Sequence, residues 1–120
     1  SSSGWYYIAL NNSKTRVYVT VSSTNSLHCF NMEGKKQYTY SPDNLKYPLG
    51  VAVDRDENIY VVGYDSHNIH QLSPEGCVLQ VITAEVPQNP WAISFSNSND
   101  TFVITNYSKE RENVHIFQLK

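Results

Sequence analysis

The sequence predicts an all-β fold in which a unit of four short strands repeats about every 42 residues. Short runs of β-branched and aromatic residues alternate with clusters of Asn, Asp, Ser, Gly and Pro, which is typical of strands joined by tight turns. No window shows the spacing of an amphipathic helix. An aromatic residue in the second run of each unit recurs at Tyr18, Tyr60 and Phe102, with a separation of 42 residues both times. Four strands in a repeat of this length predict the blades of a β-propeller.

The first run of each unit is almost continuously apolar. These runs are Tyr6 to Leu10, Val51 to Val53 and Ala92 to Phe95. They suit inner strands that neighbouring blades cover on both faces. Pro48 and Pro90 come just before two of these runs, where a missing amide donor disturbs no ladder of hydrogen bonds.

The later runs of each unit follow in the same order. The second runs are "RVYVTV", "NIYVVG" and "TFVIT", and the third runs are Ser26 to Phe30, Ile69 to Leu72 and Val114 to Phe117. Fourth runs, at Lys36 to Tyr40 and Val78 to Ile82, follow the turns "NMEGK" and "SPEGC", whose glycine can adopt the positive φ of a hairpin. The third unit has no fourth run, so we expect its blade to lack an outer strand.

The repeat divides one domain, residues 1–120, into three blades at approximately 4–46, 47–88 and 89–120. Three blades are half of a six-bladed ring, and the open ends leave blade faces uncovered. We therefore expect either a segment of a longer propeller or a half-propeller that closes by pairing with a second copy, as a homodimer.

Composition narrows the class of protein. The 120 residues have a formal net charge of −2 and are 40% hydrophobic, which suits one packed domain and argues against an overall basic, nucleic-acid-binding surface. No apolar run approaches membrane-spanning length, so no membrane association is expected. Cys29 and Cys77 fall at non-equivalent places in the repeat, and we interpret them as free thiols of a cytoplasmic protein. Sequons at Asn11, Asn99 and Asn106 are weak evidence for secretion.

The middle unit carries a family resemblance between Tyr47 and Leu79. The matching residues are Pro48, Gly50, Val51, Ala52, Val53, Asp54, Asn58, Ile59, Tyr60, Val61, Asn68, Ile69, Pro74, Glu75 and Gly76. This pattern resembles the NHL repeat, and the chain is similar to the C-terminal NHL domains of tripartite-motif (TRIM) ubiquitin ligases. The sequence departs from the family at Glu57, where glycine is preferred, and at Val21 and Gly63, where an acidic residue is usual. The resemblance implies a module that recruits substrates to a ligase, or one that binds RNA.

The histidines offer little support for metal chemistry. His28, His70 and His115 keep the same place in the three third runs, but third strands of successive blades diverge too far to share a metal ion. We expect half-exposed strand residues that alternate with core side chains, and no metal or other cofactor.

A calcium-dependent, lactonase-like hydrolase is an alternative function. Asp54, Asn12 and Ser96 follow the three first strands at equivalent positions, but turn residues explain them more simply. The sequence contains no motif that pairs a nucleophile with a base. We therefore predict that the chain itself is not an enzyme.

The favoured prediction is a binding face on one rim of the ring. The loops between fourth and first strands and between second and third strands should open on this rim. They carry Lys46, Tyr47, Tyr64, Asp65, His67, Trp91, Tyr107, Lys109 and Arg111. Aromatic residues beside cations suit both a protein partner and single-stranded RNA, and the dispersal of the basic residues favours a protein.

Overall fold

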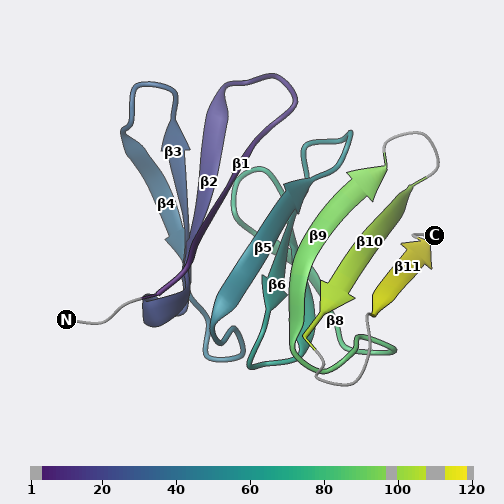
Figure 1. The fold of residues 1–120 in the computed structure, drawn as a ribbon. Coiled ribbons are helices and arrows are strands. Elements are labelled where there is room, and N and C mark those ends of the chain that lie inside the picture. The colour runs from purple at the N-terminus through teal and green to yellow at the C-terminus, as the bar shows by residue number, and fades with distance from the viewer. Residues whose placement is uncertain (1–3, 97–99, 108–112, 119–120) are drawn as a thin grey trace.

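A computed structural model describes residues 4–96, 100–107 and 113–118 of the chain. It contains three antiparallel sheets and one short 3-10 turn, η1 (Figure 1). Blade 1 contains β1 (Tyr6–Leu10), β2 (Arg16–Val21), η1 (Ser22–Thr24), β3 (Ser26–Asn31) and β4 (Lys36–Tyr40). Blade 2 contains β5 (Pro48–Val53), β6 (Ile59–Gly63), β7 (Asn68–Leu72) and β8 (Val78–Ile82). Blade 3 contains β9 (Pro90–Ser96), β10 (Thr101–Asn106) and β11 (Val114–Gln118).

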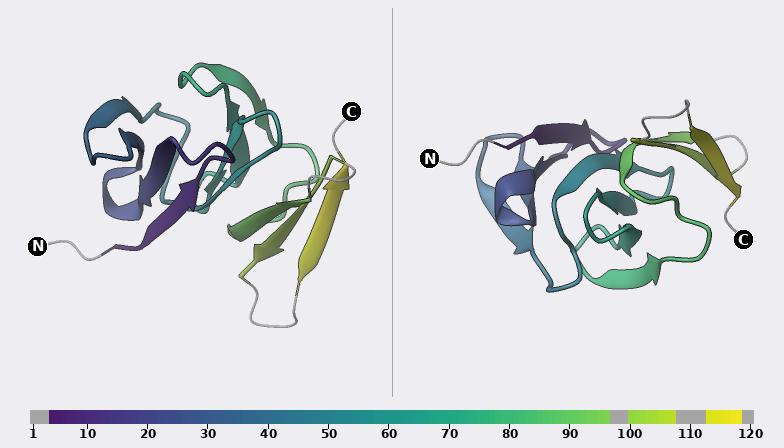
Figure 2. Two further views of the ribbon diagram at one scale, coloured as in Figure 1. Left: turned by 90° about the horizontal axis from the view of Figure 1, so that it is seen from above. Right: turned by 60° about the horizontal axis from the view of Figure 1, so that its bottom comes forward.

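Each blade is a meander in which every strand pairs with its neighbour in the chain. The inner strands β1, β5 and β9 lie side by side, while the outer strands β4, β8 and β11 spread apart (Figures 1 and 2). Gly34 and Gly76 have φ values of 85° and 92° in the hairpins before β4 and β8, as the turn sequences predict. The all-β prediction is confirmed, including a third blade with three strands among the described residues.

A glycine allows the inner strands of blades 2 and 3 to approach closely. A Cβ atom at Gly50 would lie 2.7 Å from the carbonyl oxygen of Trp91 and 3.0 Å from the Cα atom of Ala92. Because both contacts are with backbone, no side-chain rotation could relieve them. Only glycine therefore fits this crossing of β5 and β9.

Two apolar clusters join the blades. Tyr18 and Leu27 of blade 1 pack with Ile59, Val61 and Leu72 of blade 2. The second cluster joins blades 2 and 3 and contains Tyr60, Ile69, Phe102 and Ile104. Strands β5 and β6 are buried almost throughout, because blade 2 is covered on both faces.

The equivalence of the three repeated aromatic residues fails in blade 3. Tyr18 and Tyr60 each pack toward the next blade, whereas Phe102 packs back against Tyr60, with ring centroids 5.8 Å apart. Their partners in the first strand of each blade lie 9, 8 and 7 positions earlier, so the register of the hairpin changes by one residue from each blade to the next. Tyr18 and Tyr60 nevertheless pack on the same face, so the change of register alone does not explain the reversed face of Phe102.

The three histidines also differ in their surroundings. His28 and His115 are half-buried as expected, but His70 is 0% exposed, so that expectation is wrong for blade 2. Tyr40 hydroxyl lies 2.7 Å from His70 Nδ1, and His70 Nε2 lies 3.1 Å from the carbonyl oxygen of Asn44. Blade 1 supplies the tyrosine, so a residue that alternation alone would place at the surface is a buried link between blades.

Candidate functional site: an aromatic rim across three blades

Four loops meet at one end of the inner strands, the lower end in Figure 1. They are residues 41–47, 64–67 and 83–89 and the loop that begins at Tyr107, and we call them the rim loops. The backbone N–H groups of Tyr64 and Asp65 donate to the carbonyl oxygens of Tyr47 and Lys46, at 3.2 and 3.1 Å. The N–H group of Tyr107 donates to the carbonyl oxygen of Asn89 at 3.0 Å. These bonds hold the loops between blades against the loops within them.

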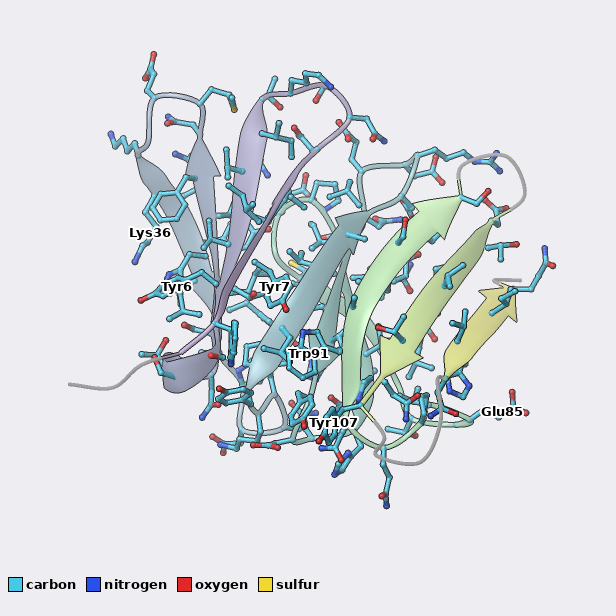
Figure 3. The ribbon with its side chains drawn as sticks, viewed as in Figure 1. Tyr6, Tyr7, Lys36, Glu85, Trp91 and Tyr107 are labelled. Carbon is cyan, nitrogen blue, oxygen red and sulfur yellow. The ribbon has the colours of Figure 1, made fainter. Side chains whose placement is uncertain are left out.

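Trp91 is at the centre of this end of the molecule. Its ring lies 5.4 Å from Tyr64 at 82°, 6.2 Å from Trp5 and 6.5 Å from Tyr107, measured between centroids. Its indole N–H also donates to the Tyr7 hydroxyl, and Figure 3 labels Tyr7, Trp91 and Tyr107. One side chain therefore contacts residues of all three blades.

We define the aromatic rim as Trp5, Tyr47, Tyr64, Trp91 and Tyr107. Tyr47 extends it, with its ring centroid 5.9 Å from that of Tyr64. Trp5 and Tyr107 flank Trp91 and are 54% and 52% exposed, so about half of their surface is accessible to a ligand. Aromatic rings that are fixed by their neighbours and partly open to water can stack on a planar or apolar ring with little loss of entropy.

The rim loops carry more negative than positive charge in the described part of the chain. Lys46 is their one cation, and the acidic residues are Asp43, Asp65 and Glu85. Burial, followed by the nearby Asp65 carboxylate, raises the pKa of Tyr64, so its hydroxyl stays neutral near pH 7. The rim therefore suits an uncharged ring better than a phosphate backbone.

The structure brings together most of the residues predicted for the binding face. Tyr47, Tyr64, Trp91 and Tyr107 form the rim, and Lys46, Asp65 and His67 lie on its loops. Lys109 and Arg111 lie outside the described residues. Trp5 and Tyr7 were not predicted for this face, because Tyr7 falls in a predicted inner strand and Trp5 just before it. The alternation around Tyr7 shows that neighbouring side chains face opposite ways, but only the fold shows that this tyrosine reaches Trp91.

The residues considered for calcium lie at the opposite end of the strands. Asp54 is 5% exposed, and its carboxylate accepts hydrogen bonds from the N–H groups of Asp56 and Asn58 and from the Tyr60 hydroxyl, at 2.9, 3.0 and 2.9 Å. Asn12 donates its side-chain amide to the carbonyl oxygen of Asp54 at 2.7 Å. Ser96 ends β9. Asp54 and Asn12 thus hold turns, and the Asp54 carboxylate already accepts hydrogen bonds from protein donors.

No three His, Cys, Asp or Glu side chains in residues 4–96, 100–107 and 113–118 are placed to hold a metal ion. We therefore derive no step through a metal from these residues.

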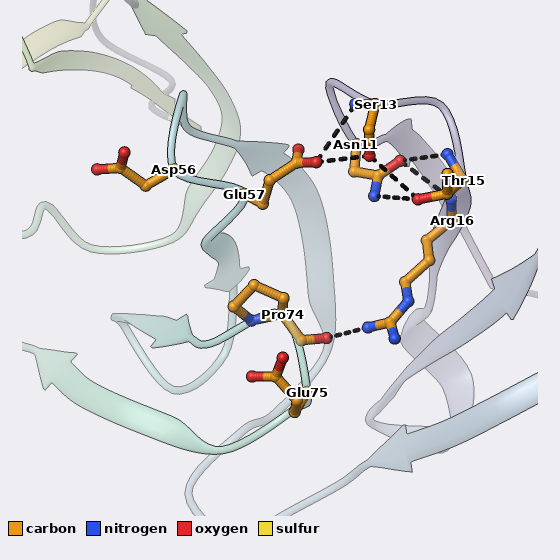
Figure 4. A pocket seen from close by; sticks show the side chains of 8 residues that line it. All are labelled: Asn11, Ser13, Thr15, Arg16, Asp56, Glu57, Pro74 and Glu75. Carbon is orange, nitrogen blue, oxygen red and sulfur yellow. Dashed lines mark hydrogen bonds between the residues drawn. The ribbon is translucent and has the colours of Figure 1, made fainter.

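A polar groove of about 270 Å³ also opens at the end opposite the rim, between blades 1 and 2 (Figure 4). The Arg16 guanidinium donates to the Pro74 carbonyl oxygen, and the Glu57 carboxylate accepts from the N–H group of Asn12 and the hydroxyl of Ser13, both at 2.7 Å. These bonds connect turns of neighbouring blades. The groove is thus bridged by its own lining residues, and we interpret it as a junction between blades.

The fold and the rim define a β-propeller segment with a candidate ligand site over its inner strands. The chain belongs to the family described as the SMP-30/gluconolactonase/LRE-like region, which matches residues 7–108. A search of the curated proteins finds no match.

Several solved structures are similar to this chain. Hydrazine synthase of Kuenenia stuttgartiensis has a TM-score of 0.81 at 15% identity, over 92% of this chain and 31% of that one. Virginiamycin B lyase from Staphylococcus aureus gives 0.69 at 13%, over 93% and 40% of the two chains. A luciferin-regenerating enzyme gives 0.65 at 17%, over 91% and 42%. These identities show the fold alone, and the chain spans less than half the length of these structures.

The comparisons correct two functional predictions. The prediction of a non-enzyme is wrong at the level of the family, because the family description includes a gluconolactonase and the structures named above include a lyase. Sequence motifs did not reveal this, since a site assembled from several blades needs no local catalytic motif. The family match supports a propeller of the kind that the NHL resemblance implies, but neither it nor these structures supports a TRIM protein or a role in ubiquitin transfer. No helix among the described residues could cross a membrane.

Proposed function

We propose that this chain supplies the aromatic wall of a substrate site in an enzyme that converts a small cyclic organic compound, with lactones as the first class to test. The observation that carries the proposal is that Trp91 joins three blades at one end of the inner strands, between two half-exposed rings. The family description, which includes a gluconolactonase, supports the choice of lactones.

The rim would bind the ring of the substrate by stacking and by burying its apolar surface. Aromatic stacking contributes about 0.5–1.5 kcal/mol beyond the burial of area. The rim loops carry one cation and three acidic residues within the described residues, which disfavours an anionic compound, so we choose an uncharged ring. The chemical step belongs to groups that the described residues do not assemble, and the proposal for this chain concerns binding and orientation.

The test combines a binding and an activity measurement. We expect dihydrocoumarin to quench the tryptophan fluorescence of the chain, and Trp91→Ala to weaken this binding at least tenfold. Leu79→Ala is the control, because Leu79 is an exposed apolar residue on the outer strand β8 and not on the rim. Hydrolysis of dihydrocoumarin and D-glucono-1,5-lactone is then followed with added calcium and with a chelator. Equal binding by both variants, or no turnover of either lactone by the complete protein, would contradict the proposal.

A protein partner on the same surface is a second proposal. Exposed Trp5 and Tyr107 beside polar loops are the residue types that dominate protein interfaces. Single-stranded RNA has less support, because Lys46 is the one cation on the described part of the rim loops. A pull-down with wild-type and Trp91→Ala chains, repeated at high salt, distinguishes a protein partner from RNA, since RNA binding would weaken steeply with salt.

Pairing with a second copy is also a proposal. Blade 1 exposes Tyr6, Ile8 and Leu10 on the face away from blade 2, and blade 3 exposes Val114 and Ile116. Such faces favour association. We expect a mass of two chains by light scattering, and a monomer with Ile8→Lys or Ile116→Lys. A monomeric wild-type chain would exclude the homodimer.

A further inference from the structure

The junctions between blades repeat one hydrogen bond with a different acceptor each time. Asn25 and His67 are 42 residues apart, and so are Tyr47 and Asn89. All four adopt left-handed backbone conformations, with φ between 53° and 55°. Asn25 Oδ1 accepts the N–H group of Tyr47 at 2.7 Å, and His67 Nδ1 accepts the N–H group of Asn89 at 3.0 Å. We call these two bonds the first and the second clasp.

The two acceptors respond differently to acid. An amide oxygen accepts a hydrogen bond throughout the physiological pH range. An imidazole nitrogen accepts only while it carries no proton, so the second clasp requires neutral His67 with its proton on Nε2. The same place in the repeat is therefore insensitive to acid in the first clasp and sensitive to acid in the second.

The second clasp holds the part of the loop that leads to Trp91. Asn89 also donates its side-chain amide to the carbonyl oxygen of Tyr64 at 3.3 Å and accepts the N–H group of Tyr107 at 3.0 Å. Strand β9 begins at the next residue, and Trp91 follows it. Asn89 thus connects the backbones that carry three of the five rings of the aromatic rim.

We propose that His67 is a positioning residue of the aromatic rim: when neutral it clasps Asn89 and keeps Trp91 and Tyr107 against Tyr64, and when protonated it releases them. Its effect on ligand affinity rests on the proposed function, whereas the clasp itself does not. Release loosens the rim and lowers its affinity for a ring-shaped ligand.

Other groups on the packed elements can titrate or carry charge. Asp65 lies on the loop of His67, Asp43 and Lys46 lie on residues 41–47, Glu85 lies on residues 83–89, and Tyr47, Tyr64 and Tyr107 belong to the rim. Histidine is the side chain whose ordinary titration falls between about pH 5 and 8. His70 can also contribute to a pH dependence. It lies in β7 and is present in every variant used below, so its contribution is the same in all of them.

The first test needs no ligand. In uniformly ¹⁵N-labelled protein titrated from pH 8 to pH 5, we expect the Asn89 amide signal to move with the same midpoint as the His67 ring nitrogens. The Tyr47 amide is the internal control and should stay in place, because Asn25 holds it. An Asn89 signal that ignores the titration of His67, or a Tyr47 signal that moves equally, would overturn the proposal.

The second test uses the chemistry of the first clasp to repair the second. His67→Asn introduces the acceptor that Asn25 already supplies, so its Asn89 amide and tryptophan emission should be the same at pH 5.5 and pH 7.5. His67→Ala should resemble the acid form of wild type at both pH values. If His67→Asn retains the pH dependence of wild type, His67 does not cause that dependence and the proposal fails.

The third test addresses affinity. Wild-type affinity for dihydrocoumarin should fall about three- to tenfold between pH 7.5 and pH 5.5, the loss expected for one hydrogen bond of modest net strength, whereas His67→Asn should bind equally at both. Equal pH dependence in both variants would remove the link between the clasp and binding. Absence of binding at every pH would contradict the proposed function, while the amide titration would still decide the clasp.

Discussion

Glu57 accepts hydrogen bonds from both the backbone N–H and the hydroxyl of Ser13, a residue 44 positions earlier in the neighbouring blade. Glu57 has a φ of 71°, a conformation that favours glycine, and its position is one where the NHL pattern has glycine. These hydrogen bonds lower the pKa of the Glu57 carboxyl group, which is therefore ionised near pH 7. In this left-handed conformation the carboxylate reaches Ser13 of blade 1.

Two substitutions of Glu57 separate strain from bonding. Glu57→Ala loses the hydrogen bonds and keeps the strain, and we expect a loss of about 1–2 kcal/mol in the free energy of unfolding. Glu57→Gly loses the same bonds but relieves the strain, so it should be more stable than the alanine variant by about 1 kcal/mol. Urea unfolding measures both. Glu75→Ala removes an exposed carboxylate from the lining of the same groove and should match wild type. An alanine variant as stable as wild type would show that these bonds contribute nothing.

Acid should destabilise the fold through His70. Burial lowers the pKa of His70 in the folded state, so the folded protein resists a proton that the unfolded chain accepts below about pH 6.5. The stabilising contribution is therefore present above that pH and is lost as the pH falls toward the folded-state pKa, by up to about 1.4 kcal/mol per pH unit. Urea unfolding at pH 7.5, 6.5 and 5.5 should show this slope. The slope should be shallower in His70→Gln than in wild type, and an equal slope would show that His70 is not responsible.

Gly50→Ala should separate β5 from β9. The added Cβ atom would meet the backbone of Trp91 and Ala92, and overpacking of this kind costs about 1–3 kcal/mol. We also expect a shift in tryptophan emission, because Trp91 lies at the crossing. Gly34→Ala is the control: nothing lies within 4 Å of its Cβ position, so strain alone should lower stability while the emission stays the same. Unchanged emission in Gly50→Ala would show that the strands tolerate the side chain.

Asn11 should carry no glycan even when the protein is expressed in a glycosylating host. Its side chain is 5% exposed, and its carbonyl oxygen accepts the N–H groups of Thr15 and Arg16 at 2.9 and 3.0 Å. The nitrogen that would be modified donates to the Thr15 hydroxyl. Mass spectrometry of the peptide containing Asn11 checks this directly. A modified peptide from folded protein would mean that the turn opens before it packs.

The strands and their order were predictable because the 42-residue repeat and the turn residues act locally. The packing direction was less predictable: the aromatic spacing places Phe102 in the equivalent strand, but its ring packs back against Tyr60 of the preceding blade, and no pattern in the repeat indicates this reversal. The convergence of Tyr47, Tyr64, Trp91 and Tyr107 followed from the order of loops in a propeller. The contact of Tyr7 with Trp91 did not, because it joins blades that no local pattern relates.

The reversed face of Phe102 in blade 3 means that the blades are not interchangeable parts. A copy of blade 2 inserted after β8 would present Tyr60 in the orientation opposite to that of Phe102, and its aromatic ring would face away from the cluster that it should fill. Duplication of one blade could have built this chain only if the apolar side chains of each copy then changed together with those of its neighbour. Each interface between blades is consequently specific to one pair of blades, so the packing fixes the order of the blades along the chain.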